Sequence, residues 1–173
     1  MFGYTEVLQV IGAMIIFSLI LMTSNSMILR NSTMQVEGEL EQETIALAQD
    51  IIEEARVKEF DATTVGSLPP TTIPGGFTAP GGLGPSGGAA EDERHEFNDF
   101  DDYDGYTETV ETEHGEFTIS TEVFYVDPNT FAPTGNRTTF KKMVVTITNA
   151  LLVDGSDNMK QYQFEFIRNY YAD

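Results

Sequence analysis

The sequence predicts an α+β fold in which a long N-terminal α-helix packs with its C-terminal half on a small antiparallel β-sheet. Residues 7–29 contain no charged side chain and continue into a stretch with helical periodicity. Residues 107–170 instead contain several stretches in which apolar and polar side chains alternate, as in half-buried strands. Because these strands follow one another after a single helix, we expect an antiparallel sheet covered by the amphipathic half of that helix.

Residues 1–30 form the first predicted segment, a hydrophobic helix. An uncharged apolar run of more than about 18 residues is long enough to span a bilayer, and this run lacks the polar face of a soluble helix. We therefore expect lipid, and later other copies of the same helix, to cover it. A cleavable signal peptide carries basic residues ahead of a shorter apolar core. The first basic residue here is Arg30, and we expect the segment to be retained.

Residues 31–60 are predicted to continue this helix with one buried face. Side chains suited to that face recur at spacings of three and four, with acidic residues between them; they are Val36, Leu40, Thr44, Leu47, Ile51 and Ala55. No proline precedes Pro69, so nothing forces a break. A helix over residues 4–58 would be about 80 Å long. We expect its first half to project from the domain.

Residues 61–90 are rich in glycine and proline, which excludes a helix or a central strand and predicts a long loop. A loop of this length in a compact domain is usually functional or mobile. We therefore expect residues 66–90 to lie on the surface and to contact a neighbouring subunit.

Residues 91–173 are predicted to form the antiparallel β domain, which begins with an acidic loop. We expect strands at residues 115–126, 140–149 and 160–170, and a short additional strand at 107–112. Alternation predicts the buried face of the sheet; its residues are Phe117, Ile119, Thr121, Val123, Tyr125, Met143, Val145, Ile147, Tyr162, Phe164 and Phe166. The helical residues Leu40, Leu47 and Ile51 should contact this face.

The acidic composition limits the classes of function. The chain has 28 acidic and 9 basic residues and a formal net charge of −19. Nucleic-acid binding needs a basic surface, so we expect no nucleic-acid partner. The chain has no cysteine, and it contains neither a phosphate-binding glycine motif followed by lysine nor a serine elbow near a histidine. We therefore expect that it is not an enzyme.

The acidic loop contains candidate calcium ligands, and no other cofactor is expected. The side-chain oxygens come from Asn98, Asp99, Asp101, Asp102 and Asp104. Phe100 occupies the first ligand position of the EF-hand template, which leaves only an irregular oxygen site. The alternative is a solvated turn with Asx-type hydrogen bonds. We expect His95 and His114, which also lie among acids, to be solvated loop residues.

Two sites match the N-glycosylation pattern of asparagine followed two residues later by serine or threonine. They begin at Asn31 and Asn136. Asn136 lies in a predicted turn between two strands, so it is the more accessible of the two.

Three stretches resemble the type IV pilins and the related pseudopilins of type II secretion. The sequence FGYTE at residues 2–6 leads into the apolar helix, as in these proteins. The stretch TIALAQDIIEEAR at residues 44–56 is similar to a helical stretch common in minor pilins. The loop FDDYDGY at residues 100–106 is similar to one in minor pilins of the mannose-sensitive haemagglutinin type.

This resemblance implies a structural subunit of an extracellular type IV pilus-like filament that serves adhesion or motility. The partners it implies are other copies of the chain, in a helical homopolymer, and the pilus assembly machinery of the inner membrane, where the subunit waits before assembly. It also implies assembly contacts for Met1, Phe2, Glu6, Gly12 and Phe17. We expect Glu6 to pair with the α-amino group of a neighbouring chain; the alternative is an interfacial residue at the membrane surface. The chain departs from the family in lacking a helix-loosening proline and a C-terminal disulfide loop, and we expect no conventional leader peptide.

Two alternatives remain at the level of the sequence: a pseudopilin of a type II secretion system, and a monomeric, single-pass membrane-anchored binding protein. The small polar side chains of residues 23–26 suit helix–helix contacts and favour a filament. The absence of flanking lysines, arginines and aromatic belts argues against a permanent membrane anchor.

Overall fold

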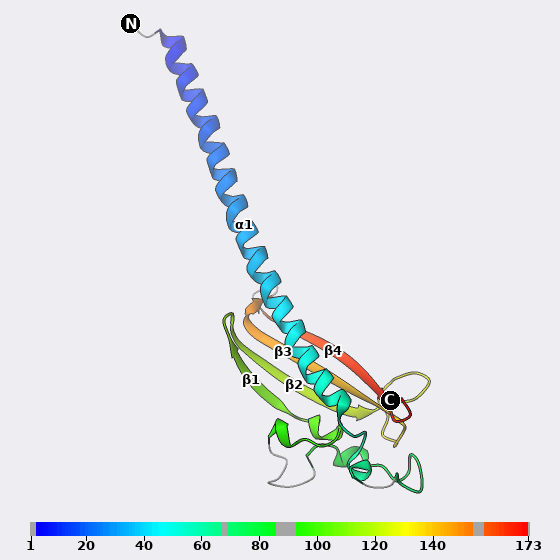
Figure 1. Ribbon diagram of the computed structural model, residues 1–173. Coiled ribbons are helices and arrows are strands. Elements are labelled where there is room, and N and C mark those ends of the chain that lie inside the picture. The colour runs from blue at the N-terminus through cyan, green and yellow to red at the C-terminus, as the bar shows by residue number, and fades with distance from the viewer. Residues whose placement is uncertain (1–2, 67–68, 86–92, 154–157, 173) are drawn as a thin grey trace. The chain divides into compact units, whose positions relative to one another are not determined.

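The computed structural model describes residues 3–66, 69–85, 93–153 and 158–172. One long helix, α1 (Tyr4–Val57), precedes four strands: β1 (Thr107–Thr112), β2 (Gly115–Tyr125), β3 (Phe140–Val153) and β4 (Met159–Asn169). Short 3₁₀ turns lie between them at η1 (Ala62–Thr64), η2 (Pro80–Gly82), η4 (Arg94–Glu96) and η5 (Asp101–Tyr103). The fold is therefore α+β, as predicted (Figure 1).

The chain divides into two compact units between Gln42 and Glu43. The first contains most of α1. The second, which we call the β domain, contains the last turns of α1, the 3₁₀ turns and the sheet. The boundary lies within the amphipathic part of the helix, about twelve residues beyond the end of the hydrophobic segment predicted at residues 1–30.

The sheet is a meander in which every neighbouring pair of strands is antiparallel, in the order β1-β2-β3-β4 (Figure 1). The strands predicted at residues 115–126, 140–149 and 160–170 correspond to β2, β3 and β4, and the short strand at 107–112 is β1. β3 extends beyond its predicted end, and its pairing with β4 is irregular between Thr148 and Val153.

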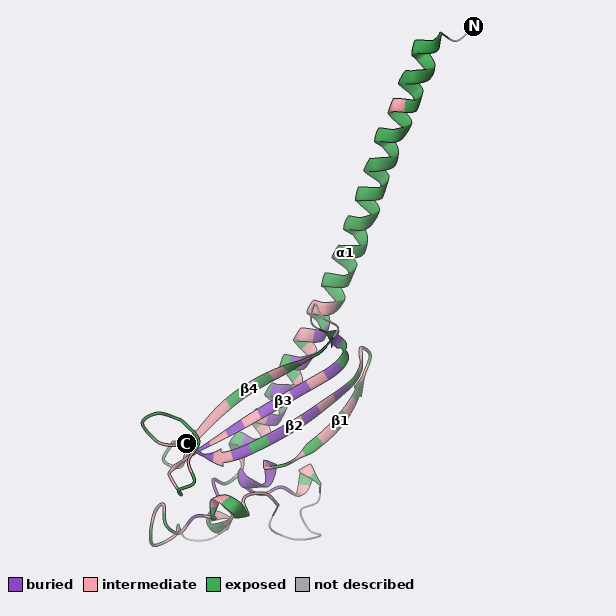
Figure 2. Cartoon of the chain, turned by 180° about the vertical axis from the view of Figure 1, so that it is seen from behind, coloured by how far each residue is buried: buried purple, intermediate pink, exposed green. Residues whose placement is uncertain are grey.

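One face of the sheet forms the core, with the helical residues from Glu43 onward lying over it (Figures 1 and 2). Its buried side chains alternate along β2 and β3, as predicted; they are Phe117, Ile119, Thr121, Val123, Tyr125, Met143, Val145 and Ile147. The predicted inward residues of β4 are half-buried and alternate with exposed glutamine and glutamate. The strand register therefore follows the period-2 pattern of the sequence.

The buried stripe of α1 differs from the predicted one at two positions, Leu47 and Val36. Within the β domain, Thr44, Ala48, Ile51 and Ala55 are fully buried, whereas Leu47 is only half-buried. Residues at i, i+4, i+7 and i+11 share one helical face, and that face passes through Ala48 rather than through the larger Leu47. In the first unit Leu40 is buried and Val36 is exposed.

The described residues 69–85 of the glycine- and proline-rich segment are exposed or half-buried, as predicted of a surface loop, with the exception of Phe77. Phe77 is only 2% exposed, and its ring lies 5.1 Å from the rings of both Phe60 and Tyr170. Ile73 and Leu83 pack against the same cluster. Although the segment is irregular, it supplies part of the core because its few apolar side chains cover the end of the sheet that the helix leaves open.

Candidate functional site

The apolar stretch of α1 presents its side chains outward along its whole length (Figure 2). At least 48% of the surface of every large apolar side chain in this stretch is exposed; they are Val7, Leu8, Val10, Ile11, Met14, Ile15, Ile16, Phe17, Leu19, Ile20, Leu21, Met22, Met27, Ile28 and Leu29. Among the described residues, α1 is the one helix long and apolar enough to cross a membrane. An exposed apolar surface of this extent needs lipid or protein to cover it.

Three hydroxyl groups in this stretch, those of Ser18, Thr23 and Ser26, are hydrogen-bonded to the helix itself. Ser18, Thr23 and Ser26 each donate to the carbonyl oxygen four residues earlier, at 2.8, 2.8 and 2.9 Å. Thr33 does the same toward Leu29 at 3.1 Å. A hydroxyl that is already hydrogen-bonded enters an apolar environment at much lower cost. The polar residues therefore leave α1 unbroken and compatible with a dry environment.

Glu6 is the only charged side chain in the first seven turns of α1, and it lies in the first turn. Its Oε2 atom accepts a hydrogen bond from the N–H of Gly3 at 3.2 Å. A carboxylate here is favoured by the unpaired N–H groups and the positive end of the helix dipole.

The remaining assembly residues predicted from the resemblance differ in their surroundings. Phe17 is 61% exposed, nothing lies within 4 Å of a Cβ built on Gly12, and Met1 and Phe2 fall outside the described residues.

Three aspartates of the acidic loop are buried, which contradicts the solvation expected of the turn, whereas its Asx-type hydrogen bonding is present between the N–H of Asp101 and Asp99 Oδ1. Asp99 and Asp101 are 1% and 2% exposed, and Asp102 is fully buried. Asp102 Oδ2 accepts the N–H groups of Asn98 and Asp99 at 2.8 and 3.1 Å. Asp104 Oδ1 accepts the N–H of Val123 in β2 at 2.8 Å. These carboxylates therefore act as internal hydrogen-bond acceptors that fold the loop onto the sheet.

A buried lysine meets the acidic loop from β3. The Nζ atom of Lys141 lies 2.7 Å from Asp61 Oδ2 and 2.9 Å from the carbonyl oxygen of Phe60, and it also pairs with Asp101 Oδ1. It lies over the Phe60 ring at 4.5 Å from the centroid. Lys141 and Asp61 are both completely buried. We call Lys141 and the four carboxyl groups of Asp61, Asp99, Asp101 and Asp102 the buried carboxyl cluster.

The pKa values of the cluster's carboxyl groups shift in opposite directions. Burial by itself would raise the pKa of Asp61, but the Lys141 charge and hydrogen bonds from Lys141 and Thr63 outweigh it and lower this pKa to about 2. Burial and the neighbouring Asp102 raise the pKa of Asp99 to about 7. Burial also raises the pKa of Asp101, to about 8, despite the attraction of Lys141.

One carboxylate oxygen each of Asp99, Asp101, Asp102 and Asp104 is engaged in another contact. Asp101 faces the Lys141 ammonium, and Asp99 Oδ1 accepts the N–H of Asp101 at 2.7 Å. In the part of the chain that the structure describes, no group of three or more histidine or acidic side chains is arranged to hold a metal ion. We therefore assign no metal ligand, and calcium binding stays a prediction from the sequence.

The motif DDYDGY joins three elements of the β domain. The hydroxyl of Tyr103, a buried residue, donates to Glu54 Oε1 of α1 at 2.9 Å. Gly105 has a φ of 77° and donates its N–H to the carbonyl of Thr121 in β2 at 3.0 Å. The N–H of Thr121 in turn donates to the Tyr106 carbonyl at 2.9 Å. The motif that carries the family resemblance therefore has a structural role, fixing the loop between helix and sheet.

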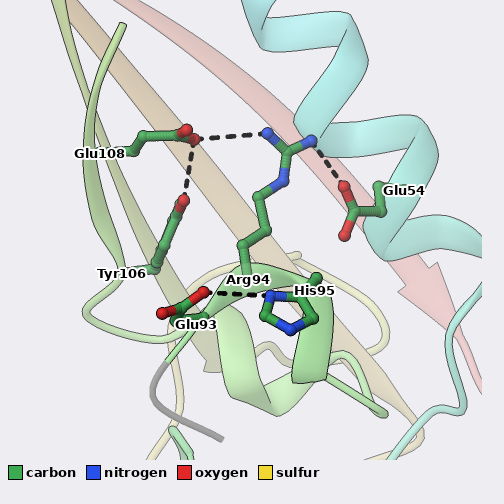
Figure 3. A pocket seen from close by; sticks show the side chains of 6 residues that line it. All are labelled: Glu54, Glu93, Arg94, His95, Tyr106 and Glu108. Atoms are coloured by element: carbon green, nitrogen blue, oxygen red, sulfur yellow. Dashed lines mark hydrogen bonds and ion pairs between the residues drawn. The ribbon is translucent and has the colours of Figure 1, made fainter.

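A second charged centre surrounds Arg94, beside a cavity of about 440 Å³ (Figure 3). The Nη2 atom of Arg94 lies 2.6 Å from both Asp50 Oδ2 and Glu54 Oε2 of α1, and Nη1 lies 3.4 Å from Glu108 Oε2 of β1. The Tyr106 hydroxyl donates to the same Glu108 oxygen at 2.8 Å. Sequence reasoning missed this residue, although Arg94 is the one base in the acidic stretch of residues 91–106.

The remaining residues predicted from the sequence make contacts of their own, and one of them, His95, lines the cavity beside Arg94 (Figure 3). Asn31 and Asn136 are exposed, so either is accessible for modification. His95 Nδ1 lies 3.3 Å from Glu93 Oε2, and both side chains are exposed, as expected of solvated loop residues. His114 differs from that prediction, because its Nδ1 lies 2.9 Å from Glu43 Oε2 and ties the turn after β1 to α1.

Comparison of the chain with known protein families, with curated proteins and with solved structures finds no match. The proposed function therefore rests on the fold and on the described side chains.

Proposed function

We propose that this protein is a structural, non-enzymatic subunit of an extracellular type IV pilus-like filament. The observation that carries the proposal is the exposed apolar stretch of α1, residues 7–29, in a chain whose β domain has its own core. The architecture is pilin-like: a long apolar N-terminal helix followed by a four-stranded antiparallel sheet. In this proposal the helices bundle to form the filament core, and the acidic β domains face outward.

The exposed stretch fits two successive environments. Before assembly, residues 7–29 lie in the inner membrane, where their length and lack of charge suit a bilayer. During assembly the same side chains exchange lipid for neighbouring helices. The internal hydrogen bonds of Ser18, Thr23 and Ser26 serve in both environments, because neither lipid nor a dry bundle supplies water to these hydroxyls.

Register within the bundle must come from packing and polar contacts. Lipid chains are as apolar as the helices, so the hydrophobic effect contributes little to the transfer. Glu6 is the one charge available to select a register. A carboxylate buried without a partner costs several kcal/mol. The α-amino group of a neighbouring chain would offset that cost; within the described residues, Glu6 accepts a hydrogen bond of 3.2 Å from the N–H of Gly3.

Glu6 substitutions test this mechanism in the producing cell. We expect Glu6→Ala and Glu6→Gln to leave membrane insertion intact and to reduce filament number or length strongly. Gln9→Ala, on an exposed polar residue one turn later, is the matched control and should assemble normally. Insertion is measured by membrane fractionation and filaments by electron microscopy of the sheared fraction. Filaments of normal abundance from both Glu6 variants would contradict the pairing mechanism.

A further inference from the structure

The exposed charges of the β domain are distributed unevenly between its two ends. The hairpin of β1 and β2 carries three exposed glutamates around its turn, which we call the acidic turn: Glu111, Glu113 and Glu116. The contact of His114 with Glu43 ties this turn to the first helical residue of the domain. Figure 1 shows the turn at the end of the sheet that lies away from the C-terminal end of the chain.

The acidic turn holds like charges close together. Glu111 and Glu116 are directly opposite each other in the pairing of β1 with β2. Like charges in such a cross-strand pair destabilise a hairpin. A cation from another molecule would relieve this repulsion.

A cavity with three basic side chains lies at the other end of the domain. It has a volume of about 740 Å³ and lies between the end of α1 and the C-terminal half of β4. The charged side chains that line it, which we call the basic groove, are Arg56, Lys58 and Arg168, with Glu53 and Glu59. In the whole chain 28 acids face 9 bases, whereas in this groove the bases are in the majority.

Arg168 is the base of this groove that has no ion-pair partner among the described residues. Its Nη1 atom donates to the carbonyl oxygens of Ala55 and Glu59 at 3.1 and 3.2 Å. The guanidinium carbon lies 5.6 Å from the centroid of the Phe100 ring. These contacts hold the side chain in place without a carboxylate in direct contact. A guanidinium in a fixed orientation suits an incoming carboxylate, which it can meet with two parallel hydrogen bonds.

Arg56 is able to change partners. It pairs with Glu53 at 3.3 Å, and the two side chains are 60% and 66% exposed. Such an exposed pair contributes about 0–1 kcal/mol. An acid from another molecule can therefore take the place of Glu53 at low cost.

We propose that the basic groove binds the acidic turn of a second copy of this chain, so that the β domains join head to tail along the filament. This inference rests on the proposed function, in which many copies form one polymer. Glu43, beside the acidic turn, and Arg56, in the groove, are separated by about 20 Å along α1. Two unlike surfaces at opposite ends of one domain make a heterologous contact, which builds an open helical filament when the rotation between copies does not close a ring.

Charge complementarity identifies the occupant of the groove. The formal net charge of the chain is −19, so two copies repel each other in most relative orientations. Bringing the acidic turn to the basic groove replaces that repulsion with attraction. Opposite charges across an interface set its orientation and register more than its affinity. The contact therefore orders the β domains, while the helices supply the core of the filament.

Charge reversal tests the contact in the producing cell. Arg56→Glu should lower the yield of sheared filaments at least about tenfold, because it places like charges together at the contact. Glu113→Arg in the same chain should restore the yield to within about twofold of wild type, since it re-creates the pair of opposite charges. Yield is measured by immunoblotting and electron microscopy of the sheared fraction, and membrane fractionation checks that each variant is inserted.

Gln161→Glu combined with Gln163→Glu is the matched control. Both glutamines are exposed on β4, and the two substitutions together change the net charge by the same amount as Arg56→Glu. This control should assemble at the wild-type level. Wild-type filaments whose yield Arg56→Glu leaves unchanged would overturn the inference and leave the proposed function in place. A loss that Glu113→Arg does not restore would also overturn it, because the groove would then bind another partner, such as the assembly machinery. A wild type that forms no filaments would overturn both.

Cysteine substitution locates the contact directly, because the chain has no cysteine of its own. Filaments of Arg56→Cys combined with Glu113→Cys, oxidised after shearing, should give a ladder of covalent multimers on a non-reducing gel, whereas each single variant should stay monomeric. The two sites of one copy are too far apart to bridge, since the Cα atoms of a disulfide lie within about 7 Å of each other. Filaments of normal yield that give no ladder would overturn the inference.

Discussion

Replacing Lys141 by methionine tests how strongly the buried carboxyl cluster holds the β domain together. Methionine keeps the length and the apolar stem of lysine but removes the charge that contacts Asp61, Asp101 and the Phe60 carbonyl. Asp61 would then be buried without its counter-charge. Removing one partner of a buried ion pair costs about 3–5 kcal/mol.

The size of the β domain converts this loss into a melting shift. The domain extends from Glu43 to Asp173, and about 1 kcal/mol lowers the melting temperature of a domain of this size by about 4 °C. We therefore expect Lys141→Met to melt about 12–20 °C below wild type at pH 7. The deficit should shrink at pH 4–5, where Asp61, deprived of its lysine, takes up a proton.

Lys142→Met is the matched control for this prediction. Lys142 is the next residue of β3 and faces the other side of the sheet, where it pairs at 2.8 Å with Glu165, whose side chain is 59% exposed. Ion pairs that remain in contact with water contribute about 0–1 kcal/mol, so this variant should melt within a few degrees of wild type. The assay is thermal unfolding of the full-length chain in detergent. Equal losses from the two substitutions would refute the reasoning.

Three further substitutions test the other contacts of the β domain, each measured by urea unfolding of the full-length chain. Arg94→Met removes the cation shared by α1 and β1 and should lower the free energy of unfolding by about 1–3 kcal/mol. Arg56→Met, in an exposed pair, is its control and should lower it by less than about 1 kcal/mol. Equal losses would contradict the role of Arg94. Gly105→Ala should cost about 1–2 kcal/mol because of its positive φ, and Gly135→Ala, which has neither a positive φ nor a crowded Cβ, should cost little. Phe77→Ala should cost about 3–5 kcal/mol, and wild-type stability of that variant would mean that Phe77 contributes little to the core.

Much of the fold follows from periodicity alone. The uncharged run and the spacing of three and four predict one continuous helix, and α1 extends over Tyr4–Val57. The alternation of apolar and polar residues predicts β2, β3 and β4 and the inward face of each, and residues 107–112 were expected as a short additional strand, which is β1. These patterns succeed because a helix and a strand each repeat their side-chain directions at a fixed period.

The burial of irregular segments was harder to predict. Glycine and proline correctly predicted that the described residues 61–66 and 69–85 form no α-helix or strand and only short 3₁₀ turns, but backbone irregularity says nothing about burial. The one aromatic residue of that stretch, Phe77, was the available signal. It reaches the core because Phe60 and Tyr170 lie beside it, and contacts between residues so distant in sequence leave no local pattern.

The same limit applies to the buried carboxyl cluster. Acidic residues 98–104 suggested a solvated turn or a calcium site, because their partner comes from a strand some forty residues later. A signal was nevertheless present in β3. Lys141 lies an even number of residues from Met143, Val145 and Ile147 in the same strand. The alternation that predicts their burial therefore also places a lysine on the inner face. A buried lysine requires an acidic partner, and that requirement points to the aspartates.

Electron microscopy of the sheared extracellular fraction, followed by helical reconstruction of any filament that an antibody against the β domain labels, tests the proposed function most directly. The proposal predicts labelled filaments whose central density is a bundle of helices corresponding to residues 7–29, with the β domains on the outside. Detection of the protein only in the membrane fraction, as a detergent-extracted monomer and with no labelled filament, would contradict it.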